Sequence, residues 1–152
     1  MATRLLDWTT NPLVALWFAC SDFASKDNGH LYFYRAYPEN IELGCSSLDP
    51  FSVSTTRVFK PNLNSQRITA QGGWFTVHPY MYGSGYVPLD TDMQHFLSIY
   101  HLEIPYVQKI TILQSLDCLG INSRVLFPGI DGLTKHVNWL FSSELPGLKR
   151  AF

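Results

Sequence analysis

The sequence predicts an α+β fold, with a small mixed sheet and about three helices, one of them central and buried. Two observations indicate this class. Apolar residues make up 46% of the 152 residues and aromatic residues 14%, which is enough for one hydrophobic core. Strand-like and helix-like segments also follow each other without regular alternation, which argues against a doubly wound parallel sheet. We therefore expect a single domain over residues 3–145 and a loose C-terminal tail over 146–152.

The most distinctive helix signal lies near the start of the chain. Asn11 is a helix-capping residue type, and Pro12 suits the first helical position because that position needs no N–H partner. The residues from 13 to 20 are then almost all apolar or small, which is typical of a helix buried on all sides. We expect Asn11 to cap this helix. The residues expected to be almost fully buried are Leu16, Trp17 and Ala19.

The remaining elements follow from periodicity and turn residues. Alternation or β-branched content predicts strands at 30–36, 68–70, 75–78 and 96–104, and an extended segment at 121–127. Apolar spacing predicts a helix that opens at Pro105 and stops at Gly120, and a last helix capped by Asp131. Residues 37–66 lack a long period, so we expect a short helix or a binding loop there.

Charge and cysteine content exclude several classes of function. The net charge is −1 and no run of Lys or Arg occurs, so no extended nucleic-acid surface is expected. The three cysteines lack a CxxC spacing, and no His pair sits beside a carboxylate on one strand face, so we expect no metal site. No signal peptide or membrane span is visible, which makes the cytoplasm the default location.

Polar residues flank the turn into the first helix. Arg4 and Asp7 either form a structural ion pair, or Arg4 anchors an anionic ligand group that Asp7 orients. Trp8 either stacks on a flat ring or packs in the core. Thr9 either caps the turn or contacts a ligand. The end of the strand thus combines charge, an aromatic ring and a hydroxyl group.

A second polar cluster lies in the middle of the chain. Arg67 and Gln71 precede paired glycines, which permit either a close backbone approach to a ligand or a plain turn. Phe75 follows in an apolar strand, and Asp131 lies in a lip-like LFPGIDG segment. We expect Arg4, Asp7 and Gln71 to face one solvent-connected pocket, because charged and polar groups beside packed segments tend to be paired or to face a ligand.

Three stretches resemble the FRG domain family, which is named for a Phe-Arg-Gly motif. They are TRLLDWTTNPLVALWFA at 3–19, RITAQGGWFTVH at 67–78 and KITILQSLDCLGINSRVLFPGIDGLTK at 109–135. Family members carry the Phe-Arg-Gly motif before the point at which this chain starts. We therefore expect this chain to lack that N-terminal segment and to show weak or no catalytic turnover by itself.

The resemblance implies a role in a bacterial or phage conflict system, with a nucleotide- or NAD-related pocket similar to that of ADP-ribosyltransferases. By that similarity Thr9 would touch the ribose, Trp8 or a loop tyrosine would stack on nicotinamide, and Gln71 would complete the site. The residues implied as catalytic are Arg4, Asp7 and Gln71. Those implied in ligand binding are Trp8, Thr9, Arg67, Phe75 and Asp131. NAD is the one cofactor implied.

A protein-binding module is the alternative. The loop from Tyr80 to Tyr86 is rich in tyrosine, as protein contact surfaces are. Such a domain would act as an inhibitor that occupies a partner surface, without catalysis. The sequence leaves both interpretations open.

Overall fold

The computed structural model of the chain describes residues 4–43, 49, 51–83, 85–89 and 98–142. Their strands are β1 (Leu5–Thr9), β2 (Gly29–Tyr34), β3 (Ile41–Leu43), β4 (Arg57–Lys60), β5 (Gly73–Val77), β6 (Tyr80–Met81), β7 (Gly85–Tyr86) and β8 (Ile99–Ile104). Their helices are α1 (Pro12–Cys20), α2 (Gln66–Gln71), α3 (Lys109–Cys118), α4 (Ser123–Leu126) and α5 (Ile130–Leu140), with 3-10 turns at Pro38–Asn40 and Tyr106–Gln108. This mixture confirms the α+β class.

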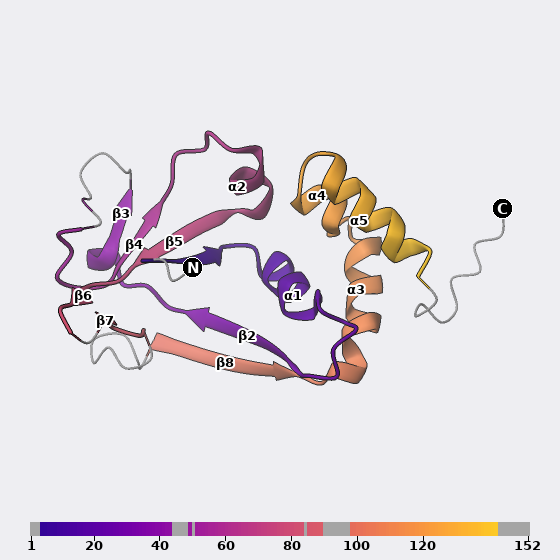
Figure 1. Ribbon diagram of the computed structural model, residues 1–152, viewed down its shortest axis with the longest axis horizontal. Coiled ribbons are helices and arrows are strands. Elements are labelled where there is room, and N and C mark those ends of the chain that lie inside the picture. Colours follow the sequence, from indigo (N-terminus) through magenta and orange to yellow (C-terminus); the bar gives the residue numbers. More distant parts are fainter. Residues whose placement is uncertain (1–3, 44–48, 50, 84, 90–97, 143–152) are drawn as a thin grey trace.

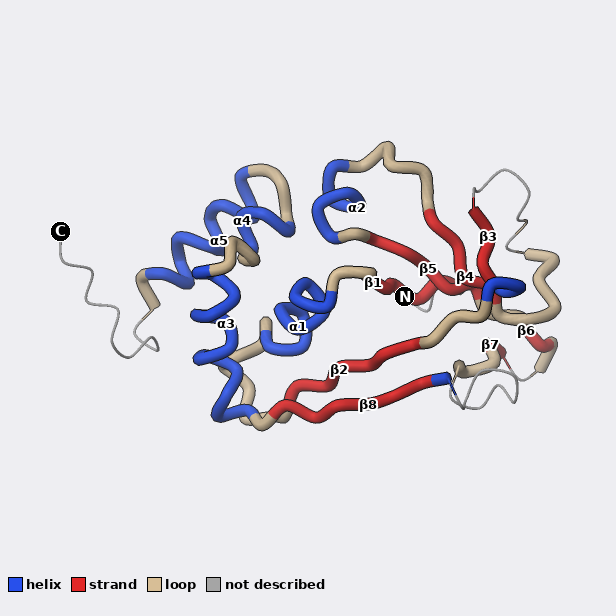
Figure 2. Tube along the Cα trace, turned by 180° about the vertical axis from the view of Figure 1, so that it is seen from behind, coloured by secondary structure: helices blue, strands red, loops and turns tan. Residues whose placement is uncertain are grey.

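The strands form three separate sheets. The largest has the order β1-β5-β4-β3, while β2 pairs with β8 and β6 pairs with β7. Figure 1 shows α1 between the four-stranded sheet and α3, with the long β2–β8 ribbon passing along its other side. The reverse view in Figure 2 shows α4 and α5 at one end of α3, with α4 facing α2. The molecule therefore has a sheet end and a helical end, and α1 lies between them.

The register of the large sheet decides which side chains share a face. β1 runs antiparallel to β5, with Asp7 opposite Phe75 and Trp8 opposite Trp74. Successive side chains in a strand point to opposite faces. Trp8 and Trp74 therefore share one face of the sheet, whereas Asp7 and Phe75 share the other.

The beginning of α1 follows the prediction. The Asn11 side chain accepts a hydrogen bond from the backbone N–H of Leu13 at 3.0 Å, and Pro12 occupies the first helical position. The strand at 30–36 is also confirmed as β2, and the helix expected before Gly120 is confirmed as α3. The expected strand at 75–78 overlaps β5, which starts two residues earlier.

The burial of α1 differs from the prediction. Val14 and Cys20 are buried, but Leu13 is 37% and Phe18 40% exposed. The residues that are only half-buried include Leu16, Trp17 and Ala19. The reason is that α1 packs against β2 and α3 over only part of its circumference. Its other sides border two cavities, so an apolar helix here is central without being enclosed.

Three local interpretations were wrong. Residues 68–70 belong to helix α2 and not to a strand, and the segment expected to be extended at 121–127 contains α4. The N-cap of α5 is Gly129, which leaves Asp131 in the first turn. The described residues thus hold five α-helices where about three were expected. Residues 37–66 contain the expected short helix as a 3-10 turn, together with β3 and β4.

Several predictions fall outside the described residues. They concern the end of the domain at residue 145, the tail at 146–152, and the first part of the strand expected at 96–104. Among the helices that the structure describes, none has both the length and the apolar character needed to cross a bilayer.

Candidate functional site

A cavity of about 310 Å³ lies where β1 leads into α1. We call it the Trp8 cavity. Its lining is mainly apolar, and the aromatic residues in it are Trp8, Tyr32, Phe33, Tyr34 and Trp74, with Thr9 beside them. Two of these, Trp8 and Thr9, are residues that the sequence predicts in ligand binding. The cavity thus lies between the face of the large sheet that carries Trp8 and the β2 strand.

Trp8 is fixed in place by its polar edge. Its Nε1–H donates to Thr76 Oγ1 at 3.1 Å, and the same hydroxyl lies 2.9 Å from His78 Nε2. The ring centroid lies 5.6 Å from that of Tyr34, with the two planes inclined by 39°. Thr76 and His78 are both buried. The indole therefore presents a ring of defined orientation to the cavity, because its one donor is already engaged behind it.

Thr9 joins three segments of the chain. Its hydroxyl donates to the backbone oxygen of Gln71 at 2.6 Å and accepts from the backbone N–H of Asn11 at 3.0 Å. These bonds hold the turn between β1 and α1 against the end of α2. Thr9 therefore has the structural role proposed for it. A hydroxyl oxygen has a second lone pair that a ligand could still use.

Gln71 makes a structural contact outside the Trp8 cavity. It is the last residue of α2, which ends at Gly72 in the left-handed conformation (φ +58°). Its side-chain Nε2 donates to the backbone oxygen of Leu126 at 2.9 Å. Arg67, one turn earlier on α2, places its guanidinium 4.9 Å from the ring centroid of Phe127. Both side chains of the second polar cluster therefore reach towards the helical end of the molecule.

Arg4 lies at the other end of β1. Its guanidinium lies over three rings, at 5.0 Å from the centroid of Phe51, 5.7 Å from Tyr80 and 5.9 Å from Tyr86. Its backbone oxygen accepts from the N–H of His78, so it faces the far end of β5. The five residues of β1 lie between Arg4 and the turn into α1, which corresponds to a separation of about 17 Å.

Asp7 and Phe75 lie on the face of the sheet turned away from the Trp8 cavity. Phe75 stacks on Phe59 with ring centroids 5.6 Å apart, and Asp7 is exposed. Strand alternation and strand length together explain why the structure does not bring Arg4, Asp7 and Gln71 into one pocket. Their catalytic roles stay a prediction of the sequence.

A second cavity, of about 550 Å³, lies between α1, α3 and α5. We call it the helical cavity. Its aromatic lining consists of Trp17, Phe18, Phe23, Phe127 and Trp139. Polar side chains also line it, among them Asp117, Asn122, Lys135 and His136. A mostly apolar lining with a few polar groups is typical of small-molecule sites.

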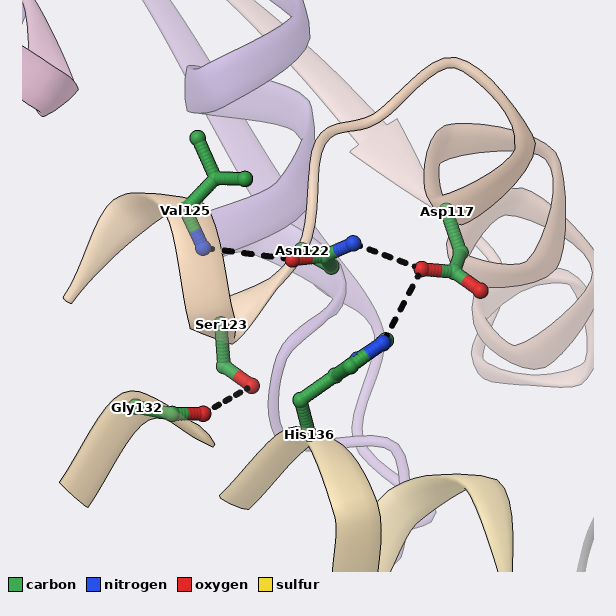
Figure 3. A network of polar contacts seen from close by, with 6 residues as sticks. All are labelled: Asp117, Asn122, Ser123, Val125, Gly132 and His136. Atoms are coloured by element: carbon green, nitrogen blue, oxygen red, sulfur yellow. Dashed lines mark hydrogen bonds and ion pairs between the residues drawn. The ribbon is translucent and has the colours of Figure 1, made fainter. Parts of the chain in front are cut away.

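Figure 3 shows the polar network beside the helical cavity. Asn122 accepts from the backbone N–H of Val125 at 3.2 Å and donates from Nδ2 to Asp117 Oδ1 at 2.7 Å. The same Asp117 oxygen lies 3.6 Å from His136 Nε2. Asn122 therefore both caps α4 and orients the carboxylate towards His136. Ser123 Oγ donates to the backbone oxygen of Gly132 at 3.2 Å, which ties α4 to α5.

Two buried polar atoms in this region have no hydrogen-bond partner among the described residues. They are Nδ1 of His136 and Nε1 of Trp139. Their rings are stacked with centroids 6.0 Å apart and planes inclined by 21°. An unsatisfied buried polar group costs about 1–3 kcal/mol. The sequence does not indicate this site, because α3, the α3–α4 turn and α5 contribute Asp117, Asn122 and His136 separately and no spacing connects the three.

The next feature is the placement of side chains that could bind a metal ion. Within the residues that the structure describes, no three His, Cys, Asp or Glu side chains lie close enough to hold an ion together. His30 Nδ1 and His101 Nε2 are 3.0 Å apart across the β2–β8 ribbon, on its exposed surface. Asp131, the remaining predicted ligand residue, is exposed in the first turn of α5.

Comparison with known protein families gives a match at the start of the chain. The family model described as the FRG domain matches residues 1–28. No curated protein and no solved structure matches the chain significantly. The matched segment contains β1 and α1, so it includes Trp8 and Thr9 of the Trp8 cavity and confirms the resemblance seen at 3–19. The stretches at 67–78 and 109–135 lie outside it. The chain therefore carries a partial match to the FRG domain, over its first strand and first helix.

Proposed function

We propose that this chain is an FRG-type domain of a bacterial or phage conflict system and that its Trp8 cavity binds the nicotinamide ring of an NAD-related nucleotide. The observation that carries the proposal is the position of this aromatic cavity directly on the segment that matches the FRG domain. Flat rings stack favourably on aromatic side chains, and Trp8, Tyr34 and Trp74 offer such surfaces.

The size of the cavity limits what it encloses. Pockets for small molecules range from roughly 300 to 1,000 Å³. At about 310 Å³ the Trp8 cavity suits one ring with its ribose, not a whole dinucleotide. The phosphates would then lie over Thr10 and Pro12 at the start of α1, where the helix dipole favours negative charge.

We do not assign turnover to this cavity. An ADP-ribosyltransferase-like reaction requires a polar group near the nicotinamide ribose. Gln71, the residue that the resemblance implies for that role, directs its amide towards Leu126. Binding without efficient turnover is therefore the form of the proposal that these contacts support.

Thermal unfolding with nicotinamide mononucleotide and with NAD tests the proposal. A ligand that binds only the folded state raises the midpoint. Tyr32 lines the cavity and is 52% exposed, so Tyr32→Ala should weaken the shift with little effect on the fold. Tyr100→Ala is the matched control, because Tyr100 is 54% exposed on the same ribbon and does not line the cavity. No shift for the unmodified protein, or equal loss in both variants, would contradict the proposal.

A second function, protein binding, is favoured by the β6–β7 hairpin. Tyr80 is 50%, Met81 56% and Tyr82 100% exposed, and exposed aromatic side chains are enriched at protein interfaces. We propose that this hairpin contacts a protein partner in the same conflict system. Tyr82→Ala should then remove a stoichiometric partner from the protein purified from its host, while the unfolding temperature stays unchanged. Retention of the same partner by the variant would exclude the hairpin as the contact.

A further inference from the structure

We propose that the helical cavity is a second ligand site, which binds a flat aromatic ring carrying an anionic group. A nucleoside monophosphate is the simplest ligand of this class. The proposal is independent of the Trp8 cavity, because the two cavities share no lining residue. It rests on the aromatic walls, on two cations that contact the lining residue Phe127, and on the partners of the acidic group inside.

The walls are suited to a flat ring. Trp17 and Phe18 of α1 both lie near Phe127, with ring centroids 5.9 and 6.0 Å from that ring. Trp139 of α5 also lines the space. A volume of about 550 Å³ lies well within the range of small-molecule sites, roughly 300–1,000 Å³.

Two positive side chains meet at Phe127. Arg67 reaches it from α2, with its guanidinium 4.9 Å from the ring centroid, and Lys135 reaches it from α5, with Nζ at 5.3 Å. Both residues are exposed. Cation–π contacts at exposed sites are weak, so either side chain can turn to a phosphate at small cost. Lys135 lines the cavity, and Arg67 meets it at the lining residue Phe127, so two cations from separate elements favour an anionic ligand on this side.

The acidic group in the cavity already has partners. Asp117 accepts from Asn122 and faces His136, so its charge is directed to these two side chains. Trp139 supplies a buried N–H donor that has no partner among the described residues. Protein atoms cover this N–H as it stands, so a ligand would accept from it only after the indole turns in the cavity. The polar groups therefore select a ring with an acceptor atom.

Calorimetric titration with adenosine 5′-monophosphate tests the site, with adenosine and inorganic phosphate as separate ligands. The monophosphate should bind, adenosine should bind about tenfold more weakly, and phosphate alone should not bind detectably. Lys135→Ala and Arg67→Ala should each weaken monophosphate binding about tenfold. Arg124→Ala is the matched control, since Arg124 is exposed on neighbouring α4 and does not line the cavity.

The variants also separate the two cavities. Tyr32→Ala should leave binding of adenosine 5′-monophosphate unchanged, because Tyr32 lines the Trp8 cavity and not the helical cavity. Trp139→Phe keeps a ring but removes the N–H, so it should weaken binding of adenosine as well as of the monophosphate. Absence of monophosphate binding would overturn the proposal. So would equal loss in Lys135→Ala and Arg124→Ala, or loss of monophosphate binding in Tyr32→Ala.

Discussion

Asn11 shows how one side chain sets the start of a helix. Its Oδ1 accepts from the N–H of Leu13, which would otherwise lack a partner inside the helix. Since α1 has only nine residues, the loss of one cap removes a large share of its end stabilisation. We predict that Asn11→Ala lowers the free energy of unfolding by about 0.5–2 kcal/mol, measured by urea denaturation.

The control for this prediction is Asn62→Ala. Asn62 is exposed in an irregular segment between β4 and α2. Its replacement should change stability by less than about 0.5 kcal/mol. If both variants lose the same amount, the hydrogen bond of Asn11 does not stabilise α1.

The described cysteines should differ in reactivity. Burial raises the pKa of the Cys20 thiol, and the nearby charge of Lys109 offsets only part of this rise. A raised pKa leaves less thiolate at a given pH, and the thiolate is the reactive form. At pH 8 we predict that iodoacetamide modifies exposed Cys118 much faster than Cys20, as measured on separate peptides by mass spectrometry. Equal rates at the two sites would show that Cys20 is accessible in the native state.

At the residue scale, the sequence predicted which residues line the Trp8 cavity better than it predicted the contacts of the polar side chains. Trp8 and Thr9 were predicted beside a ligand, and both line a cavity. The grouping of Arg4 with Asp7 failed for a reason already visible in the sequence. They are three positions apart, and two-residue alternation along a strand points such side chains to opposite faces. The role of Gln71 could not be predicted, because its amide contacts a backbone oxygen 55 residues away.

At the element scale, α4 and α5 depend on a close approach at Gly132. A Cβ atom at this position would collide with the backbone oxygen of Phe127 and lie 2.6 Å from that of Ser123. Gly132 is also buried, and its own oxygen accepts from Ser123 Oγ. We predict that Gly132→Ala lowers the free energy of unfolding by about 1–3 kcal/mol, because the two helices must move apart.

Asn138→Ala is the comparison for Gly132→Ala. Asn138 lies on the same helix and is exposed, so this change tests the effect of a new Ala residue without a collision. It should be neutral or slightly stabilising, since Ala favours helices. If Gly132→Ala lowers the free energy of unfolding by less than about 0.5 kcal/mol, α4 and α5 can move apart at little cost in stability.

The elements were predicted well where the pattern was long and poorly where it was short. α1, α3 and β2 each carry a clear start or a clear period. The six residues of α2 cover less than two turns, so β-branched Ile68 and Thr69 were sufficient to suggest a strand. α4, with four residues, is capped by the Asn122 side chain, and neither helix is long enough to show an apolar period.

At the scale of the whole molecule, one core cluster joins the two ends. Cys20, Leu31, Ile104 and Leu113 come from α1, β2, β8 and α3, and all four are buried. We predict that Leu113→Ala lowers the free energy of unfolding by about 2–5 kcal/mol. Leu119→Ala is the matched control, because Leu119 follows the same helix and is 65% exposed. Similar losses in both variants, measured by urea denaturation, would show that the cluster is not the main core.

Neither cavity could be predicted from the sequence. Each is enclosed by elements that are distant along the chain, and its size depends on how closely those elements pack. The apolar surface of α1 was correctly expected, but the sequence does not show which of its sides face other elements and which face a cavity. That distinction requires the positions of β2, α3 and α5 around the helix.

The attachment of the α4–α5 pair has a consequence for local unfolding. The two helices pack closely on each other. Side-chain contacts join the pair to the other helices from Gln71 to Leu126, from Asn122 to Asp117 and from His136 to Asp117. Most residues of α4 and α5 are exposed, and a unit with few buried side chains can detach while the sheets remain folded. Its amides should then exchange with deuterium faster than those of β1 and β5, and Gln71→Ala should speed this exchange further. When the pair detaches, solvent would briefly reach His136 Nδ1 and Trp139 Nε1, which are buried in the folded protein.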